Sequence, residues 1–122
     1  MTAKILVVED DEKVRDSMTR LLKLKGYEVT EARHGQQAVE LATEQLFDLV
    51  LMDVKMPTLD GVSAFQQIRA AYPTTKVILT TGFAINEELK RVLTEGHVQC
   101  LQKPFTYDQL TAAMEDLLSS PG

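Results

Sequence analysis

Cysteine is nearly absent from this sequence, and tryptophan, long apolar runs and an excess of positive charge are absent altogether. The 122 residues include one cysteine, Cys100, which excludes an internal disulfide and argues against a cysteine-based metal site. No run of 18 apolar residues occurs, so we expect no transmembrane helix, no signal peptide, no membrane partner and a cytoplasmic location. The net charge of −5 argues against direct nucleic acid binding through a broad basic surface.

The chain has the size and composition of one globular domain. With 44% hydrophobic and 25% charged residues over 122 positions, it can bury about two-thirds of its unfolded surface in a single core. We expect the domain to span residues 1–118. The Ser-Ser-Pro-Gly ending at 119–122 is then a tail or the start of a linker.

Short apolar runs alternate five times with helical patterns. The predicted strands are residues 5–8, 27–32, 49–52, 77–80 and 98–101. The predicted helices lie between residues 11 and 25, at 36–45, at 62–72, from the cap Asn86 to residue 93, and after the cap Thr106. On the first helix we expect Val14, Met18, Leu21 and Leu22 to face the core, because they recur at i, i+4, i+7 and i+8. On the helix at 62–72 we expect Phe65, Ile68 and Ala71 to face inward.

This alternation predicts the α/β class, with a five-stranded parallel sheet, right-handed crossovers and helices on both faces. The flavodoxin-like order 2-1-3-4-5 is taken from known folds of this size rather than deduced from the sequence. The hydrophobicity of the strands fits it. Runs 5–8, 49–52 and 77–80 are apolar on both faces, as central strands should be, whereas 27–32 alternates like an edge strand.

Acidic side chains follow two of the apolar strands. Glu9, Asp10 and Asp11 come after the first run, and Asp53 comes directly after the third. If those strands are neighbours, Glu9, Asp10 and Asp53 converge, and each pair of charges about 4 Å apart repels by roughly 4 kcal/mol at an effective dielectric of 20. An acidic cluster alone is more often a solvated loop. As a site, it suits Mg²⁺, with Mn²⁺ as a substitute.

Two further strands end in groups that complement a phosphate. Thr81 supplies a hydroxyl after the fourth strand, and Lys103 supplies a positive charge after the fifth. A phosphoryl group on Asp53 would carry nearly two negative charges, and a divalent ion, an ammonium and a hydroxyl donor would neutralise it from three sides. We therefore interpret Asp53 as a nucleophile that accepts a phosphoryl group.

Four segments together resemble the receiver domains of two-component response regulators, the CheY-like family. They are VVEDD at 7–11, LMDVKMPTLDG at 51–61, LTTG at 79–82 and LQKPF at 101–105. Asp10 and Asp53 are 43 positions apart, Asp53 and Thr81 are 28 apart, and Thr81 and Lys103 are 22 apart. Each segment alone is weak evidence, whereas all four in this order on a repeated strand–helix pattern are specific.

The resemblance implies a metal site and its ligands. Asp10, Asp53 and the backbone carbonyl of Lys55 would bind Mg²⁺ directly, and Glu9 would assist through water. Asp53 would be phosphorylated by the phosphohistidine of a sensor histidine kinase or a phosphotransfer protein.

The resemblance also implies how the phosphoryl group is held and read. Thr81 and Lys103 would contact its oxygens, and the Lys103–Pro104 peptide bond would be cis. A protein target or an output domain, unidentified by the sequence, would read the change. The chain would be no enzyme beyond catalysing its own phosphorylation and slow dephosphorylation.

The sequence departs from the family at one position. Receivers usually carry Tyr or Phe three residues before the lysine, where this chain has Cys100. A thiol cannot fill an aromatic pocket, so signalling through an aromatic switch is not expected, and we read Cys100 as a small, half-buried hydrophobic residue. Motion of the 82–95 segment would carry the signal instead. Lys55 and Phe83 flank the path of an attacking water and could slow hydrolysis of the acyl phosphate.

Three other functions fit the same pattern less well. A flavodoxin-like cofactor binder would need Gly/Ser/Thr-rich loops, and these loops are acidic. A metal-dependent phosphoesterase would need a histidine or a second base in the pocket. A receiver-like docking module that no longer switches remains the main alternative, because of Cys100.

Overall fold

The computed structural model describes residues 2–56 and 59–120, so two residues of the segment at 51–61, and the last two of the predicted tail, lie outside the described residues. The strands are β1 (Lys4–Val8), β2 (Glu28–Ala32), β3 (Leu49–Asp53), β4 (Lys76–Thr81) and β5 (Val98–Gln102). The helices are α1 (Glu12–Leu24), α2 (Gly35–Glu44), α3 (Gly61–Ala71), α4 (Glu87–Leu93) and α5 (Tyr107–Ser119).

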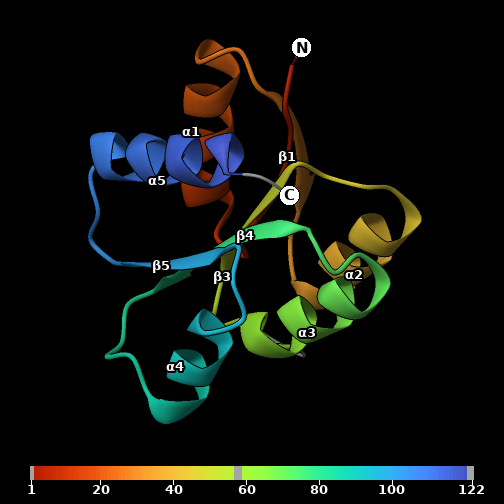
Figure 1. The fold of residues 1–122 in the computed structure, drawn as a ribbon. Coiled ribbons are helices and arrows are strands. Elements are labelled where there is room, and N and C mark those ends of the chain that lie inside the picture. Colours follow the sequence, from red (N-terminus) through yellow and green to blue (C-terminus); the bar gives the residue numbers. More distant parts are fainter. Residues whose placement is uncertain (1, 57–58, 121–122) are drawn as a thin grey trace.

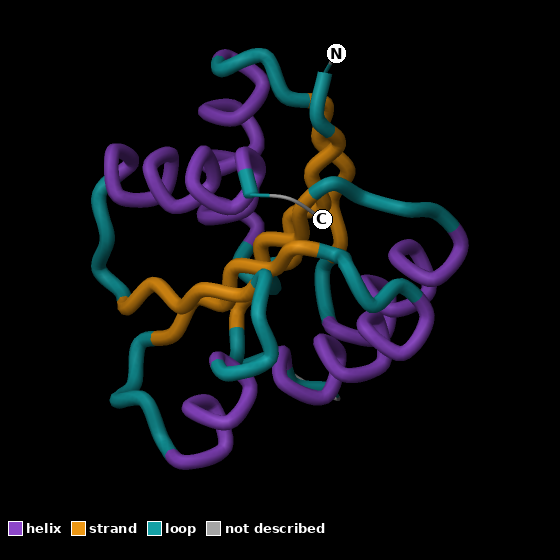
Figure 2. The backbone as a smooth tube through the Cα atoms, in the orientation of Figure 1, coloured by secondary structure: helices purple, strands orange, loops and turns teal. Residues whose placement is uncertain are grey.

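The strands form one parallel sheet in the order β2-β1-β3-β4-β5, which confirms the predicted fold class and topology. Figure 1 shows α1 and α5 on one face of the sheet and α2, α3 and α4 on the other. Figure 2 shows the strands as a single twisted band between the two groups of helices. In the described part of the chain, no helix combines the length and apolar content needed to cross a membrane.

The strand sequences explain which strands are central. β3 is buried at all five positions, and β1 is buried at its last four, because both faces are covered by helices. Alternate residues of β1 enter different cores: Ile5 and Val7 pack with α1 and α5, and Leu6 and Val8 pack with α2, α3 and α4. β2 mixes exposed and buried positions, as expected of an edge strand.

Polar side chains begin each of the helices. The caps are Asp11, His34, Asp60, Asn86 and Thr106, each of which accepts a hydrogen bond from a backbone N–H in the first turn. Asp11 accepts from Lys13 and Val14 at 2.9 and 3.1 Å, so the third acid of the segment at 9–11 begins α1. Asn86 and Thr106 cap the helices predicted to start there.

Two inward-facing positions were wrongly predicted. Val14 is 41% exposed, and the buried stripe of α1 consists of Arg15, Met18, Thr19 and Leu22. Met18 and Leu22 face the core as predicted, but the stripe extends to the side of Arg15 rather than Val14, because Arg15 makes ion-pair and hydrogen-bond contacts that bury its charged side chain. Ala71 was expected to face inward from α3 and is exposed at the last turn of that helix.

Most boundaries differ by a residue from the sequence patterns, and three of them concern the site or the tail. Asp53 and Thr81 are the last residues of β3 and β4 rather than the residues after them. Helix α5 continues through Ser119, one residue into the expected tail. The domain limit at residue 118 stays a prediction.

Candidate functional site

The carboxyl ends of β1 and β3 bring three carboxylates together. β1 and β3 are paired in register from Ile5–Leu49 to Val8–Met52, so Glu9 and Asp10 emerge beside Asp53. One carboxylate oxygen from each of Glu9, Asp10 and Asp53 lies within 4.8 Å of the others. Glu9 is only 2% exposed and Asp53 is 7% exposed, whereas Asp10 faces solvent.

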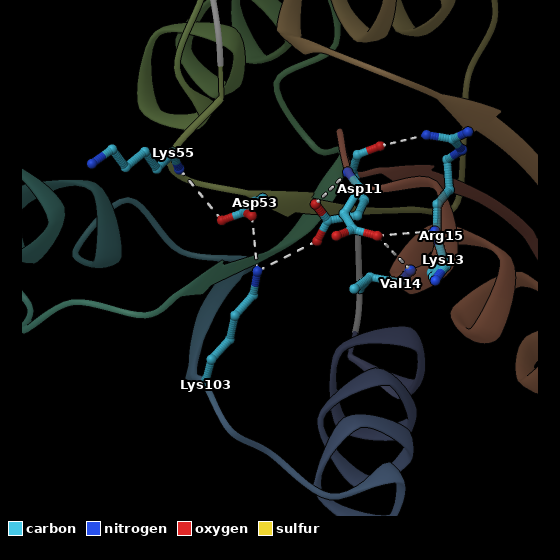
Figure 3. Close-up of polar contacts among 8 residues, drawn as sticks. Asp11, Lys13, Val14, Arg15, Asp53, Lys55 and Lys103 are labelled. Carbon is cyan, nitrogen blue, oxygen red and sulfur yellow. Dashed lines mark hydrogen bonds and ion pairs between the residues drawn. The ribbon is translucent and has the colours of Figure 1, made fainter.

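Lys103 neutralises part of this charge. Its Nζ donates to Asp53 Oδ2 at 2.8 Å and to Glu9 Oε1 at 3.4 Å, and Figure 3 shows the side chain extending toward Asp53 from its position directly after β5. The Lys103 N–H donates to the Thr81 carbonyl at 2.7 Å, which fixes the base of the side chain against β4. The Lys103–Pro104 peptide bond is cis, as the resemblance implies.

Burial and neighbouring charges shift two pKa values in this cluster. Burial of Glu9 is the main reason that its pKa is raised; the neighbouring acids Asp10 and Asp53 add to the effect, and the Asp11 N–H and Lys103 oppose it. Partial burial lowers the pKa of Lys103, but its hydrogen bond to Asp53 and the charges of Asp53 and Glu9 together outweigh burial and raise it. Lys103 therefore stays charged, and Glu9 binds a proton more readily than an ordinary glutamate.

The segment after β3 supplies the far wall of the pocket. Lys55 donates its backbone N–H to Asp53 Oδ1 at 3.4 Å, and Figure 3 shows its side chain directed away from the carboxylates. Its Nζ lies 4.7 Å from the centroid of the Phe83 ring, a cation–π contact. The role of the Lys55 carbonyl as a metal ligand stays a prediction.

Thr81 lies beside this pocket rather than in its wall. The pocket has a volume of about 530 Å³ and is lined by Asp10, Asp53, Lys55, Met56, Gly82, Phe83 and Lys103. The buried Thr81 lines a neighbouring cavity of about 310 Å³, and its hydroxyl oxygen accepts a hydrogen bond from the Phe83 N–H at 3.1 Å. Lys55 and Phe83 line both spaces and so stand between them.

Cys100 lies in the middle of β5, opposite Leu79 of β4, and is half-buried against the core that contains α2, α3 and α4. Burial raises the pKa of its thiol. These surroundings are those of a small hydrophobic residue.

Arg15 is the residue near the site that the sequence analysis missed. It is 6% exposed; its Nη1 donates to the Glu9 carbonyl and its Nε to Glu31 Oε2, both at 2.9 Å. Its spacing from Met18 and Leu22, three and seven residues, puts an arginine on an apolar stripe. That signal could have identified a buried charge with a partner.

The donor set of the pocket fits a hard divalent cation. All three clustered side chains offer carboxylate oxygens, and with Lys103 they leave a formal excess of two negative charges. Mg²⁺ binds few protein carboxylates and retains several waters, which the solvent-facing Asp10 permits. The residues present therefore fit Mg²⁺.

Comparison with known proteins gives one consistent family. The model of the response regulator receiver domain matches residues 5–115. The transcriptional regulatory protein ZraR of Escherichia coli (strain K12) is 38% identical over 115 residues, which are 94% of this chain and 26% of that protein. The response regulator MprA of Mycolicibacterium vanbaalenii is 36% identical over 118 residues, 97% of this chain and 51% of that protein. The chain thus spans about a quarter to a half of these relatives.

Solved structures agree in fold. A CheY-like receiver domain protein from Methanospirillum hungatei JF-1 superimposes with a TM-score of 0.90 at 28% identity, covering 97% of this chain and 94% of that one. The receiver domain of the sensor histidine kinase PA1611 from Pseudomonas aeruginosa PAO1, with a magnesium ion coordinated in its active site cleft, gives 0.87 at 33% identity, covering 98% of this chain and all (100%) of that one. The chain belongs to the response regulator receiver domain family.

Proposed function

We propose that this chain is a phosphorylation-activated signalling switch whose phosphoacceptor is Asp53. The observation that carries the proposal is the contact of 2.8 Å between Lys103 Nζ and Asp53 Oδ2, inside a pocket that also holds Glu9 and Asp10. A fixed ammonium beside one carboxylate of an acidic cluster faces the place where phosphoryl oxygens would develop charge.

The donor is the phosphohistidine of a sensor histidine kinase or of a phosphotransfer protein in the cytoplasm. One oxygen of the Asp53 carboxylate forms the new P–O bond while the P–N bond breaks, and the imidazole nitrogen keeps the electron pair. No separate base is needed, because the attacking carboxylate is already ionised. Lys103 then exchanges its contact with Asp53 for the phosphoryl oxygens.

Mg²⁺ would be held by Asp10, Asp53 and the Lys55 carbonyl, with Glu9 acting through water. When bound, it supplies positive charge to the phosphoryl oxygens. Thr81 completes the set: its oxygen accepts from the Phe83 N–H, so its own proton remains available for donation to the phosphoryl group. That donation requires the hydroxyl to reach the neighbouring pocket, which would pull on the segment after β4.

The change is read by a partner protein or by an output domain, since the relatives are two to four times as long as the matched region. A second candidate is a receiver-like docking module that no longer switches. It is favoured by two observations: Cys100 stands where receivers usually have an aromatic ring, and Thr81 lies outside the wall of the Asp53 pocket.

The two candidates are separated by intact mass after incubation with Mg²⁺ and a small phosphodonor. Acetyl phosphate and phosphoramidate should each add one phosphate to the native protein. Asp53→Asn should gain none, and Asp108→Asn, which alters an exposed carboxylate in the first turn of α5, should react like the native protein. No gain in the native protein, with either donor or with a phosphorylated kinase, would favour the docking module.

A further inference from the structure

We propose that Arg15 is the positioning residue of the metal-binding loop, because one guanidinium ties the Glu9 peptide to the carboxylate of Glu31 on β2. The inference rests on the proposed function and names a residue through which that site acts. Figure 3 shows Arg15 reaching from α1 on the side of the acidic residues opposite Lys103. Arg15 touches neither Asp53 nor the place of a metal ion, so any effect must pass through the loop.

The Glu9 backbone is held on both sides. Its N–H donates to the Ala32 carbonyl at 3.1 Å, and its carbonyl accepts from Arg15 Nη1 at 2.9 Å. The Glu9 side chain is held as well, by the Asp11 N–H at 3.1 Å and by Lys103 at 3.4 Å. These contacts restrain both the backbone and the carboxylate of Glu9.

The orientation of Asp10 follows from the same peptide. The Glu9 carbonyl belongs to the planar unit that joins Glu9 to Asp10, so rotation of that unit would swing the Cα–Cβ bond of Asp10. Asp10 faces solvent, and within the described residues its carboxylate accepts no hydrogen bond from an N–H group or a hydroxyl that would fix it directly. The contact from Arg15 therefore restrains the peptide on one side of a proposed metal ligand, and the hydrogen bond from the Asp11 N–H to Glu9 restrains the peptide on the other side.

The chemistry of the contact requires arginine. Nε and Nη1 act at once, on the Glu31 carboxylate and on the Glu9 carbonyl, both at 2.9 Å. The planar guanidinium presents these two donors at a fixed angle, whereas the ammonium of a lysine is a single point that cannot span both acceptors in the same way. The side chain is 7% exposed, so water cannot replace a lost donor on the Glu9 carbonyl without entering the core.

A second arginine shows what a purely structural role looks like. Arg69 of α3 donates from Nε to the Thr75 carbonyl at 2.7 Å and from Nη2 to the Gly96 and His97 carbonyls at 2.8 and 2.9 Å. These carbonyls lie where β4 and β5 begin, at the edge of the sheet opposite the acidic cluster. Arg69 thus bridges backbone segments as Arg15 does, but away from the site, and it is the matched control.

The test measures the Mg²⁺ dissociation constant by calorimetry together with the thermal midpoint without metal, for the native protein, Arg15→Met, Arg15→Lys and Arg69→Met. Removing outer partners of metal ligands commonly weakens metal binding by 10- to 100-fold, and we expect both Arg15 variants to weaken Mg²⁺ binding by about 10-fold. Arg69→Met should lower the midpoint and leave the dissociation constant within about twofold. If Arg15→Met does not fold, Arg15→Lys carries the test.

Phosphorylation gives a second readout. Because only metal affinity is lowered, saturating Mg²⁺ should restore the rate of phosphate gain from acetyl phosphate in Arg15→Lys, whereas no Mg²⁺ concentration restores Asp53→Asn. Folded Arg15 variants with native Mg²⁺ affinity would overturn the proposed role of Arg15, and so would an equal loss of Mg²⁺ affinity in Arg69→Met. Neither result would overturn the proposed function. A native protein that neither binds Mg²⁺ nor gains phosphate would instead overturn the proposed function.

Discussion

The two ends of the parallel sheet, where its strands begin and where they finish, differ in how they bind cationic side chains; each end is called an edge below. At the edge where the strands end, Lys103 and Arg15 pair with the carboxylates of Asp53, Glu9 and Glu31. At the edge where the strands begin, Arg69 donates to three backbone carbonyls, and Lys76 Nζ donates to the carbonyls of Ser120 and Leu118 at the end of α5 at 2.6 and 3.4 Å. Both cations where the strands end pair with carboxylates, and Arg15 also donates to the Glu9 carbonyl, whereas the hydrogen bonds of the two cations where the strands begin all go to backbone carbonyls.

This difference has an energetic consequence. Carbonyl acceptors do not repel one another as ions and do not titrate, so the contacts at the starting edge add stability at every ordinary pH. Three carboxylates within 4.8 Å repel by roughly 3 to 4 kcal/mol for each pair at an effective dielectric of 20, and a single lysine offsets only part of that. Where the strands end, the carboxylates therefore repel one another, and a bound cation would reduce that repulsion. Where the strands begin, the contacts contribute to stability without such repulsion.

The largest effect is expected from the glycines at the ending edge. A Cβ on Gly61 would collide with the Asp53 carbonyl oxygen and lie 2.8 Å from the Val54 Cα, whereas a Cβ on Gly82 would meet nothing within 4 Å. Gly61→Ala should lower the free energy of unfolding by about 1–3 kcal/mol or more, because backbone must move. Gly82→Ala should be neutral or stabilise by up to about 1 kcal/mol, since its φ is not positive.

Urea unfolding followed by far-ultraviolet circular dichroism measures both changes, because the chain has no tryptophan to report by fluorescence. Equal stabilities for the two alanine variants would show that the backbone of Asp53 is not packed against α3 as described.

A smaller effect is expected at the starting edge. Lys76→Met removes the donor from the last carbonyls of α5 and should lower the free energy of unfolding by about 0.5–1.5 kcal/mol. Because Lys76 is at the far end of β4 from Thr81, the rise of the thermal midpoint caused by Mg²⁺ should match that of the native protein. A smaller Mg²⁺-induced rise of the thermal midpoint in Lys76→Met would mean that the two edges are coupled, which would contradict the distinction drawn between them.

The contact between Lys55 and Phe83 should have a smaller effect still. The Lys55 Nζ is 4.7 Å from the centroid of the Phe83 ring. Phe83 is exposed, and at exposed positions such contacts contribute about 0.5–1 kcal/mol. If the pair shields the acyl phosphate on Asp53, the Lys55→Ala/Phe83→Ala variant should lose its phosphate up to about fivefold faster, the rate change that about 1 kcal/mol produces.

The lifetime is measured by intact mass after the phosphodonor is removed. Lys90→Ala, which removes an exposed cation of α4 that lines neither space, should keep the native lifetime. A double variant with the same lifetime as the native protein would exclude shielding.

The strands and helices were predictable because their sequence signals are local, whereas the strand order was taken from known folds. The apolar runs of β1, β3 and β4 mark central strands, and the caps Asn86 and Thr106 mark helix starts. The phase of α1 was not predictable from periodicity alone. Arg15 is buried and Val14 is exposed because Arg15 has acceptors on β2 and on the loop after β1, which are distant in sequence from one another.

The candidate site was predictable in composition and less so in geometry. Parallel strands in a known order necessarily bring Glu9, Asp10 and Asp53 to one edge, so their clustering follows from topology. The orientation of Thr81 does not follow, because it depends on a hydrogen bond with the Phe83 N–H formed by the turn after β4. Sequence patterns specify where a side chain starts, and contacts between loops decide where it points.

The smallest effect is expected midway between the edges, at Cys100, where burial is the only influence on the pKa. Burial favours the neutral thiol, so its stabilising contribution is present below the ordinary pKa of a thiol and is lost as the pH rises through the raised value. The rate of alkylation by iodoacetamide should therefore level off at a higher pH in the folded protein than in urea. The pH of that inflection reports the pKa of the thiol. Limited access of iodoacetamide to Cys100 lowers the rate by the same factor at every pH and does not move the inflection. An inflection at the same pH in the folded protein and in urea would mean that a positive charge near Cys100 compensates for burial. The contrast between the end of the sheet that holds carboxylates and the middle of β5 would then fail.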